Sequence, residues 1–233
     1  VAGLTHGSGL VVGQVQVDQK SNEIPAARDL LALMDLDGVV VTLDAMHTQD
    51  DTAQMIVERG GDYVLTVKGN QPKLRDELKA LPWRDVPSST YTERGHGRVA
   101  TRTVKALVTP AWIEFPGCAQ VLQVRRTVTR KGRRTVEVAY LICSVPMEQA
   151  QPLTVAAWIQ GHWGVEVRLH WIRDVTFDED RSQVRRGNGP TVMAALRNMA
   201  ITALRLAGWD DIAQAVRHLS RDCHRVANLL LTS

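Results

Sequence analysis

Short apolar runs alternate with amphipathic segments over the first third of the chain. The apolar runs, rich in β-branched residues, predict strands, and the segments between them carry apolar residues at helical spacing. We expect strands at 10–17, 39–43 and 62–68, and helices at 26–34, 52–59 and 74–81. Strands alternating with helices predict an α/β layer with a largely parallel centre.

The pattern changes near Pro82. From Tyr91 to Val145 the chain is rich in Val and Thr, alternates, and has turn residues between its runs, which predicts an antiparallel β meander. A long helix is expected from Thr154 to about Arg173, followed by a polar segment and two or three amphipathic helices over 191–231. We therefore divide the chain into segments 1–81, 82–150 and 151–233.

The composition is that of an ordinary globular protein. Apolar residues make up 44% and charged residues 23% of the 233 residues, and no window approaches the roughly 18 apolar residues of a membrane helix. The start has no signal-peptide pattern. It also lacks Met and begins within a strand pattern, so we expect sequence to be missing upstream. The three cysteines form no CxxC pair, which predicts buried free thiols in a reducing cytoplasm: Cys118, Cys143 and Cys223.

The net charge of +3 says little, but its distribution is uneven. Ten cationic residues fall within about forty positions that hold few acids, a density typical of phosphate-contact surfaces. A well-solvated basic hairpin explains the same pattern equally well. The ten residues are Arg94, Arg98, Arg102, Lys105, Arg125, Arg126, Arg130, Lys131, Arg133 and Arg134.

Acidic residues mark three candidate sites. Asp44 ends a buried strand, where open α/β sheets place their sites, although a turn aspartate is the simpler explanation. Glu166 shares one predicted helix face with His162 and His170. That stripe fits a carboxylate magnesium site, a zinc site, or histidines packed beside two tryptophans. A third, acidic run either solvates a loop or helps position DNA or a metal: Asp174, Asp178, Glu179 and Asp180.

Four phrases, in this order, closely resemble insertion-sequence transposases of the H-repeat-associated branch: 18–25, 41–46, 62–71 and 162–180. The resemblance covers nearly the whole chain. It implies a ribonuclease-H-like fold with a β insertion before the last acidic helix and a helical tail. Asp44 matches the second acid of the family's triad and Glu166 the third. The first belongs to an upstream Asp-Gly-Lys segment that nothing here matches, and Gln160 stands where relatives usually carry Arg.

The resemblance also implies a chemistry: cleavage and joining of double-stranded DNA at transposon ends and target, with Mg²⁺ (or Mn²⁺) held by Asp44 and Glu166. His162 and His170 would orient Glu166 or contact phosphate. Lys20, Asn22 and Glu23 would lie near the site in an undefined role, and Asp18 or Glu23 is a poor substitute for the first acid. The expected DNA contacts are Lys68, Arg94, Arg98, Arg102, Arg125, Arg126, Arg130, Arg133 and Arg134.

Two other functions stay open at this point. A catalytically inactive DNA-binding remnant would keep the fold and the basic surface, and a zinc hydrolase would use the histidine-flanked Glu166. Because the first acid is missing, we expect weak or absent catalysis by this chain, with DNA binding retained. The expected location is the bacterial cytoplasm at the nucleoid, and pairing of two copies on DNA is left open.

Overall fold

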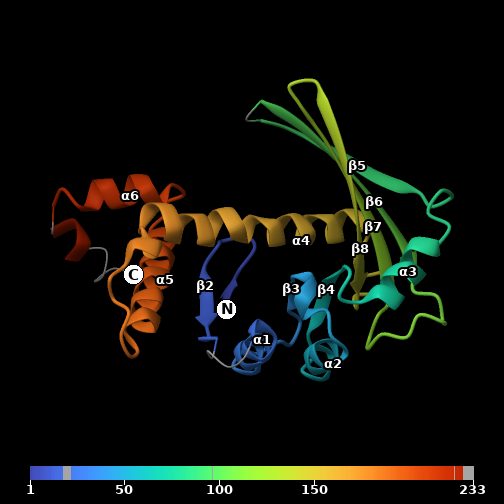
Figure 1. Cartoon of the computed structure of the whole chain (residues 1–233), viewed down its shortest axis with the longest axis horizontal. Helices are drawn as coiled ribbons and strands as arrows, with labels where there is room; N and C mark the ends of the chain where they lie inside the picture. Colours follow the sequence, from blue (N-terminus) through green and yellow to red (C-terminus); the bar gives the residue numbers. More distant parts are fainter. Residues whose placement is uncertain (18–21, 96, 223, 228–233) are drawn as a thin grey trace. The chain divides into compact units, whose positions relative to one another are not determined.

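The computed structural model describes residues 1–17, 22–95, 97–222 and 224–227, with the Glu166 side chain left out (Figure 1). Asp18, Lys20 and Cys223 lie outside the described residues. The chain forms two compact units. The first combines Val1–Leu33 with Gly161–Ser233, and the second is Met34–Gln160.

The second unit is built on a six-stranded mixed sheet in the order β3-β4-β8-β7-β6-β5. Its elements are β3 (Val40–Leu43), the 3₁₀ turn η1 (Ala45–His47), α2 (Asp50–Glu58), β4 (Asp62–Val67), α3 (Pro72–Ala80), β5 (Ser88–Gly95), β6 (Arg98–Val108), β7 (Gln120–Arg130), β8 (Arg133–Cys143) and most of α4 (Pro152–Val165). Within this sheet only β3 and β4 are parallel. The α/β class is confirmed, but the parallel centre is one pair wide because β8, the last strand of the meander, joins β4.

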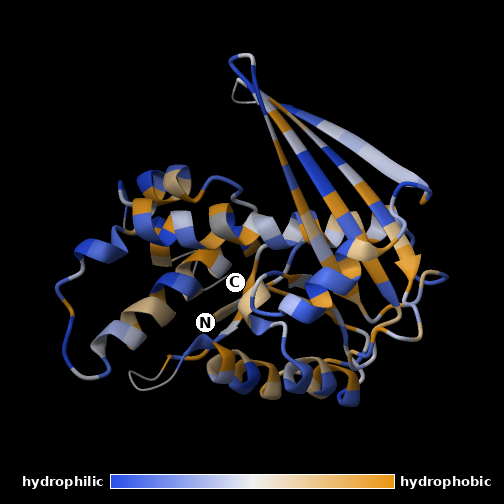
Figure 2. Ribbon diagram, turned by 45° about the vertical axis from the view of Figure 1, so that its right-hand side comes forward, coloured by the Kyte–Doolittle hydropathy of each residue, from blue (hydrophilic) through white to orange (hydrophobic). Residues whose placement is uncertain are grey.

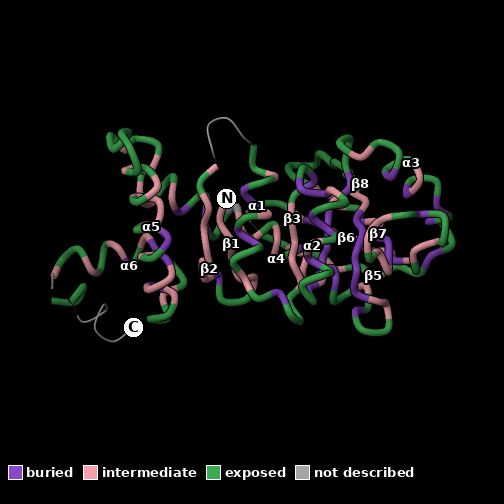
Figure 3. The backbone as a smooth tube through the Cα atoms, turned by 90° about the horizontal axis from the view of Figure 1, so that it is seen from below, coloured by how far each residue is buried: buried purple, intermediate pink, exposed green. Residues whose placement is uncertain are grey.

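Helices cover both faces of this sheet. Alternate residues of β6 are buried, as expected for strands that pack on one face. The first face carries Val64, Leu122 and Leu141, which form one core with Val155 and Ile159 of α4. On the second face, Trp83 after α3 packs on Tyr140 with ring centroids 6.2 Å apart. Buried positions therefore concentrate along the sheet strands (purple in Figure 3).

The first unit joins a small hairpin to helices from the end of the chain. Its elements are β1 (Ala2–Leu4), β2 (Val11–Gln14), α1 (Glu23–Ala32), the end of α4, the π-helical turns η2 (Glu166–His170) and η3 (Ile172–Thr176), the 3₁₀ turn η4 (Glu179–Arg181), α5 (Gly189–Leu206) and α6 (Ile212–Leu219). Leu169, Ile172, Ile201, Leu204 and Ile212 form its core, against which Leu4 and Val11 of the hairpin pack.

Local signals set several helix starts. Asn22 accepts a hydrogen bond from the Ile24 amide at 3.0 Å and caps α1, and Pro72 occupies the first turn of α3. The expected helix from Thr154 ends earlier as an α-helix, at Val165, and continues as π-helical turns. No helix among the described residues is long and apolar enough to cross a membrane.

Two of the three cysteines lie among the described residues. Cys143 is buried, Cys118 is partly buried, and both are free thiols. Burial raises the pKa of the Cys143 thiol to about 12 and also raises the pKa of Cys118. These two residues are therefore poor nucleophiles at neutral pH.

Candidate catalytic loops and basic sheet end

Asp44 is the first residue after β3 and is exposed. It precedes η1 as its N-cap residue, and its backbone carbonyl accepts a hydrogen bond from the His47 amide at 2.9 Å. The half-buried β3 therefore delivers this carboxylate to the carboxyl end of the only parallel strand pair among the described strands. The predicted strand end is confirmed, but the prediction of a buried strand is wrong, because β3 lies at the edge of the sheet.

The loop that carries Asp44 is held by the loop that follows β4. The Asn70 side chain donates to the Ala45 carbonyl at 2.6 Å, and the Gln71 side chain donates to the Thr48 carbonyl at 3.0 Å. The Thr48 hydroxyl in turn donates to the Thr66 carbonyl at 2.7 Å. Sequence reasoning missed Asn70 and Gln71 as positioning residues, although a polar pair directly after a buried strand was a usable signal.

Lys68 leaves the sheet at the same edge as Asp44. Leu43 pairs with Leu65 in the parallel register, so Lys68 extends two residues beyond the position level with Asp44. The Lys68 side chain is exposed. This edge therefore presents one carboxylate and one ammonium group from neighbouring strands.

Glu166 is the first residue of η2, where the helix changes from α to π winding. Such changes inside α-helices are frequent at functional sites. His162, before the change, is partly buried, and His170, after it, is exposed. The zinc hypothesis assumed continuous α-helical winding from His162 to His170, which the structure does not have. Glu166 belongs to the first unit and Asp44 to the second.

Gly161, directly before the phrase 162–180, allows the hairpin loop of β1 and β2 to approach the helix. A Cβ atom there would lie 2.5 Å from Nδ1 of His6. Arg168 holds the same loop by donating to the His6 and Gly7 carbonyls at 2.7 and 3.2 Å. Burial, followed by the charges of His162 and Arg168, lowers the pKa of His6, which is therefore a neutral ring at pH 7.

Glu179, in the acidic run, forms an ion-pair network. It accepts two hydrogen bonds from Arg173 at 2.6 and 2.7 Å and one from Arg197 of α5 at 3.4 Å. The hydrogen bonds from Arg173 hold the pKa of Glu179 below its usual range. This acid joins η3 and η4 to α5, so its role in the structure is to position that segment.

Many arginines of the meander lie near the turns that join β5 to β6 and β7 to β8, and this end of the sheet is hydrophilic in Figure 2. Arg98, Arg130 and Arg133 pair directly across β6, β7 and β8, so the three exposed side chains form one row on one face. Lys131 and Gly132, both with positive φ, form the tight turn beside it. Three exposed arginines lie on the opposite face: Arg94, Arg125 and Arg134.

Arg102 differs from the other arginines because it is only 7% exposed. Its guanidinium donates to Glu93 at 2.6 Å and lies 5.7 Å from the centre of the Tyr91 ring. Gln160 of α4 donates to the other Glu93 oxygen at 2.5 Å. Through Glu93, Arg102 therefore helps to join α4 to the sheet. Arg126 is partly buried as well, and its Nη1 lies 3.9 Å from Oε2 of Glu137.

Two carboxylates are the candidate metal ligands of this chain. Among the described residues, no three His, Cys, Asp or Glu side chains gather closely enough to hold a metal ion, and Glu166 lies outside that comparison. The expected pair, Asp44 and Glu166, consists of hard oxygen donors, which suit Mg²⁺ or Mn²⁺.

These features define a mixed α/β protein with an exposed acid at a sheet edge and an arginine-rich sheet end. The family model of the transposase DDE domain matches residues 1–203, and the chain belongs to that family. It is 34% identical over 219 residues to "Putative transposase YncI" of Escherichia coli O157:H7, covering 88% of this chain and 55% of that protein.

Two further relatives come from Escherichia coli K12. "H repeat-associated putative transposase YhhI" is 34% identical over 84% of this chain and 55% of its own length. "H repeat-associated putative transposase YbfD" is 42% identical over 40% of this chain and 39% of its own length. The expected H-repeat-associated transposase family is confirmed. The chain spans about 55% of the length of the first two relatives.

Proposed function

We propose that this chain is part of a DNA transposase that cleaves and joins phosphodiesters at insertion-sequence ends, with a ribonuclease-H-like core. The observation that carries the proposal is the pair of hydrogen-bonded loops after β3 and β4, which present the exposed Asp44 and Lys68 at the carboxyl end of these two strands. Membership of the transposase DDE family supports the same function.

Asp44 and Glu166 would hold divalent metal, since both offer carboxylate oxygens. Bound divalent ions would supply Lewis-acid activation of a water or 3′-hydroxyl and would stabilise the leaving oxygen. The loop hydrogen bonds fix the backbone after Asp44 and the pairing of β3 with β4 fixes it before Asp44, so little order has to be gained when its carboxylate binds. Lys68 would contact a phosphate of the DNA strand at the same edge.

The basic sheet end would bind the DNA backbone. Like charges placed directly opposite in a sheet destabilise it, so the row of Arg98, Arg130 and Arg133 has a cost that bound phosphate offsets. Arg94, Arg125 and Arg134 would contact DNA from the opposite face. Arg102 and Arg126, which lie against Glu93 and Glu137, would support the surface from within the sheet.

DNA binding tests this surface directly. The triple variant Arg98→Gln/Arg130→Gln/Arg133→Gln should bind duplex DNA more weakly in fluorescence anisotropy at all sequences. Each lost phosphate contact should also reduce the slope of log K against log salt by about 0.9. The matched control is Arg75→Gln/Lys79→Gln/Arg84→Gln, three exposed cations on and after α3. Equal losses in both triples would refute the assignment.

Catalysis requires a separate experiment because nothing in this chain matches the family's first acid. For this chain alone we expect weak or absent nicking. A protein extended upstream through an Asp-Gly-Lys segment should nick transposon-end DNA with Mg²⁺ or Mn²⁺, and Asp44→Asn or Glu166→Gln should abolish nicking while DNA binding persists. No nicking by the extended protein would favour the DNA-binding remnant.

A further inference from the structure

The polar side chains of α5 all make contacts inside the first unit. This 18-residue helix has five residues with polar side chains, and each is hydrogen-bonded to the hairpin strand, its loop or the ion-pair network. The pairs are Thr191 with Gln16, Arg197 with Glu179, Asn198 with Gln14, Thr202 with the Val11 amide, and Arg205 with the Gly9 carbonyl. The remaining surface of α5 is therefore apolar.

That outward surface carries a regular stripe at spacings of four, three, four and three residues: Val192, Leu196, Met199, Ala203 and Leu206. Its large members are 51–66% exposed. An apolar stripe with this repeat is the pattern by which one helix packs along another. A helix that is apolar on both its inner and its outer side is normally covered on both.

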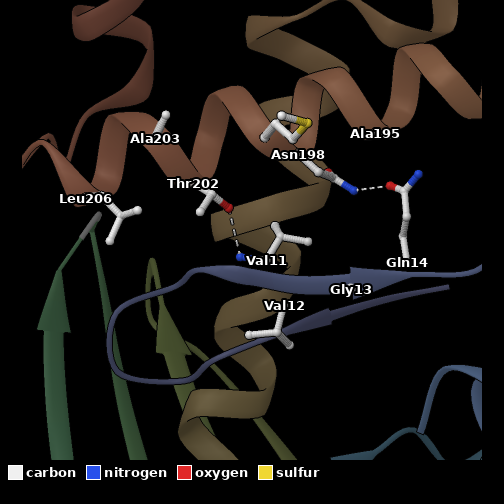
Figure 4. A pocket seen from close by; sticks show the side chains of 10 residues that line it. Val11, Val12, Gly13, Gln14, Ala195, Asn198, Thr202, Ala203 and Leu206 are labelled. Atoms are coloured by element: carbon white, nitrogen blue, oxygen red, sulfur yellow. Dashed lines mark hydrogen bonds between the residues drawn. The ribbon is translucent and has the colours of Figure 1, made fainter. Parts of the chain in front are cut away.

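A hollow beside the stripe extends the apolar surface. It has a volume of about 340 Å³ and lies between α5 and β2 (Figure 4), and Met199, Ala203 and Leu206 of the stripe line it together with Val12. Val12 is 55% exposed. The stripe with its hollow thus offers both a ridge and a recess to an incoming apolar helix.

The charges that flank α5 favour a second copy in antiparallel orientation. Arg185 and Arg186 precede the helix, Asp210 and Asp211 follow it, and all four are exposed. Arg186 comes 13 residues before Met199 and Asp211 comes 12 residues after it. Two antiparallel helices that cross at Met199 would place the basic flank of each copy beside the acidic flank of the other. Their helix dipoles would also run in opposite directions, which is a favourable arrangement.

We propose that α5 is a self-association surface through which two copies of this chain pair in antiparallel fashion about Met199. An 18-residue helix is about 27 Å long and 10 Å wide, so the stripe offers roughly 270 Å² per copy. A stable dimer buries about 800 Å² per partner. The dimer formed by this surface is therefore weak and concentration-dependent, and it forms without DNA.

Sedimentation equilibrium of the whole chain without DNA tests the proposal. The wild-type protein should shift from monomer to dimer as its concentration rises, and Met199→Glu should raise the dissociation constant at least about tenfold, because two carboxylates meet at the centre. The matched control is Leu153→Glu, at an apolar position of α4 that is 58% exposed. It should dimerise like the wild type.

Two variants with opposite charges at position 199 should dimerise with each other if the two helices cross at Met199. Met199→Glu and Met199→Lys should each be monomeric alone and form a mixed dimer together. A wild-type chain that stays monomeric at all concentrations would overturn the proposal, as would dimerisation unaffected by Met199→Glu. A lower melting temperature for Met199→Glu without a change in association would show that the chain covers its own stripe, and would also overturn it. Loss of DNA binding has no bearing on these outcomes.

Discussion

Replacing Gly161 by Ala tests why a glycine stands inside α4. Helix propensity alone predicts that this change stabilises the protein by about 0.5–1 kcal/mol. The structure predicts the opposite, because the added Cβ would lie 2.5, 2.6 and 2.8 Å from Nδ1, Cγ and Cβ of His6. Rotating the His6 ring cannot relieve the contact with its Cβ, so the loop must move. Overpacking of this kind costs about 1–3 kcal/mol, so we expect a net destabilisation of up to about 2.5 kcal/mol.

A double-mutant cycle in urea, followed by circular dichroism, separates the two effects. In a His6→Gly background no Cβ remains to be struck, and Gly161→Ala should stabilise by about 0.5–1 kcal/mol. In a His6→Ala background the Cβ contact persists, and the same change should remain unfavourable. If Gly161→Ala stabilises the wild-type protein, or if its effect is equal in all three backgrounds, the close approach of loop and helix is refuted.

The same histidine gives the first unit a pH dependence. His6 has a lower pKa in the folded protein than the unfolded value of about 6.5, so the unfolded state binds its proton more readily. Its contribution to the free energy of unfolding is full above pH 6.5 and declines as the pH falls from there to the folded pKa. Urea titrations between pH 5 and 8 should show this decline in the wild type and a smaller one in His6→Gly.

Three other perturbations have defined outcomes. Glu179→Gln should lower the free energy of unfolding by about 1–3 kcal/mol at pH 7, since it removes charged hydrogen bonds to Arg173. Because the folded pKa of Glu179 is depressed, the difference should persist above about pH 4.3 and vanish as the pH falls through the folded value; a difference independent of pH would contradict the ion pair. In a Cys118→Ser/Cys223→Ser background, Cys143 should react with iodoacetamide at pH 8 about a thousandfold more slowly folded than in urea, because its pKa is about 12. Equal rates would show that the thiol is accessible. Asn70→Ala should speed amide exchange over 44–49 with little change over 120–143, and unchanged exchange over 44–49 would show that the loop stands without this hydrogen bond.

Local patterns were sufficient to predict most elements of the chain. Apolar β-branched runs located β3 and β4 within one or two residues, and the same pattern placed Asp44 at a strand end. The meander followed from alternation and turn residues, which are also local signals. These features are determined within a few residues of one another, so the sequence alone carries them.

Non-local pairing could not be predicted in the same way. Nothing near β8 shows that it joins β4, a register that brings Cys143 beside Val64 across almost eighty residues of chain. The ion pair of Arg102 with Glu93 follows from the register of β5 and β6, and charge density alone made Arg102 look like a DNA contact. The change to π winding at Glu166 could not be predicted either, because the spacing of apolar residues there is the same as in a continuous α-helix.

Two residues of the phrases that carry the family resemblance, Asp62 and Asn70, and Gly161 just before the last phrase position other parts of the chain. Asp62 accepts a hydrogen bond from the Ser144 hydroxyl at 2.6 Å, and that hydroxyl accepts one from the Tyr63 amide at 2.8 Å, which fastens β8 to β4. Asn70 holds the Asp44 loop, and Gly161 admits the hairpin loop to the helix that leads to Glu166. If Asp44 serves only as a metal ligand, Asp44→Asn in the protein extended upstream should abolish nicking without changing stability. Replacing Asp62, Asn70 or Gly161 should lower both together, and this contrast would separate the architecture of the site from its chemistry.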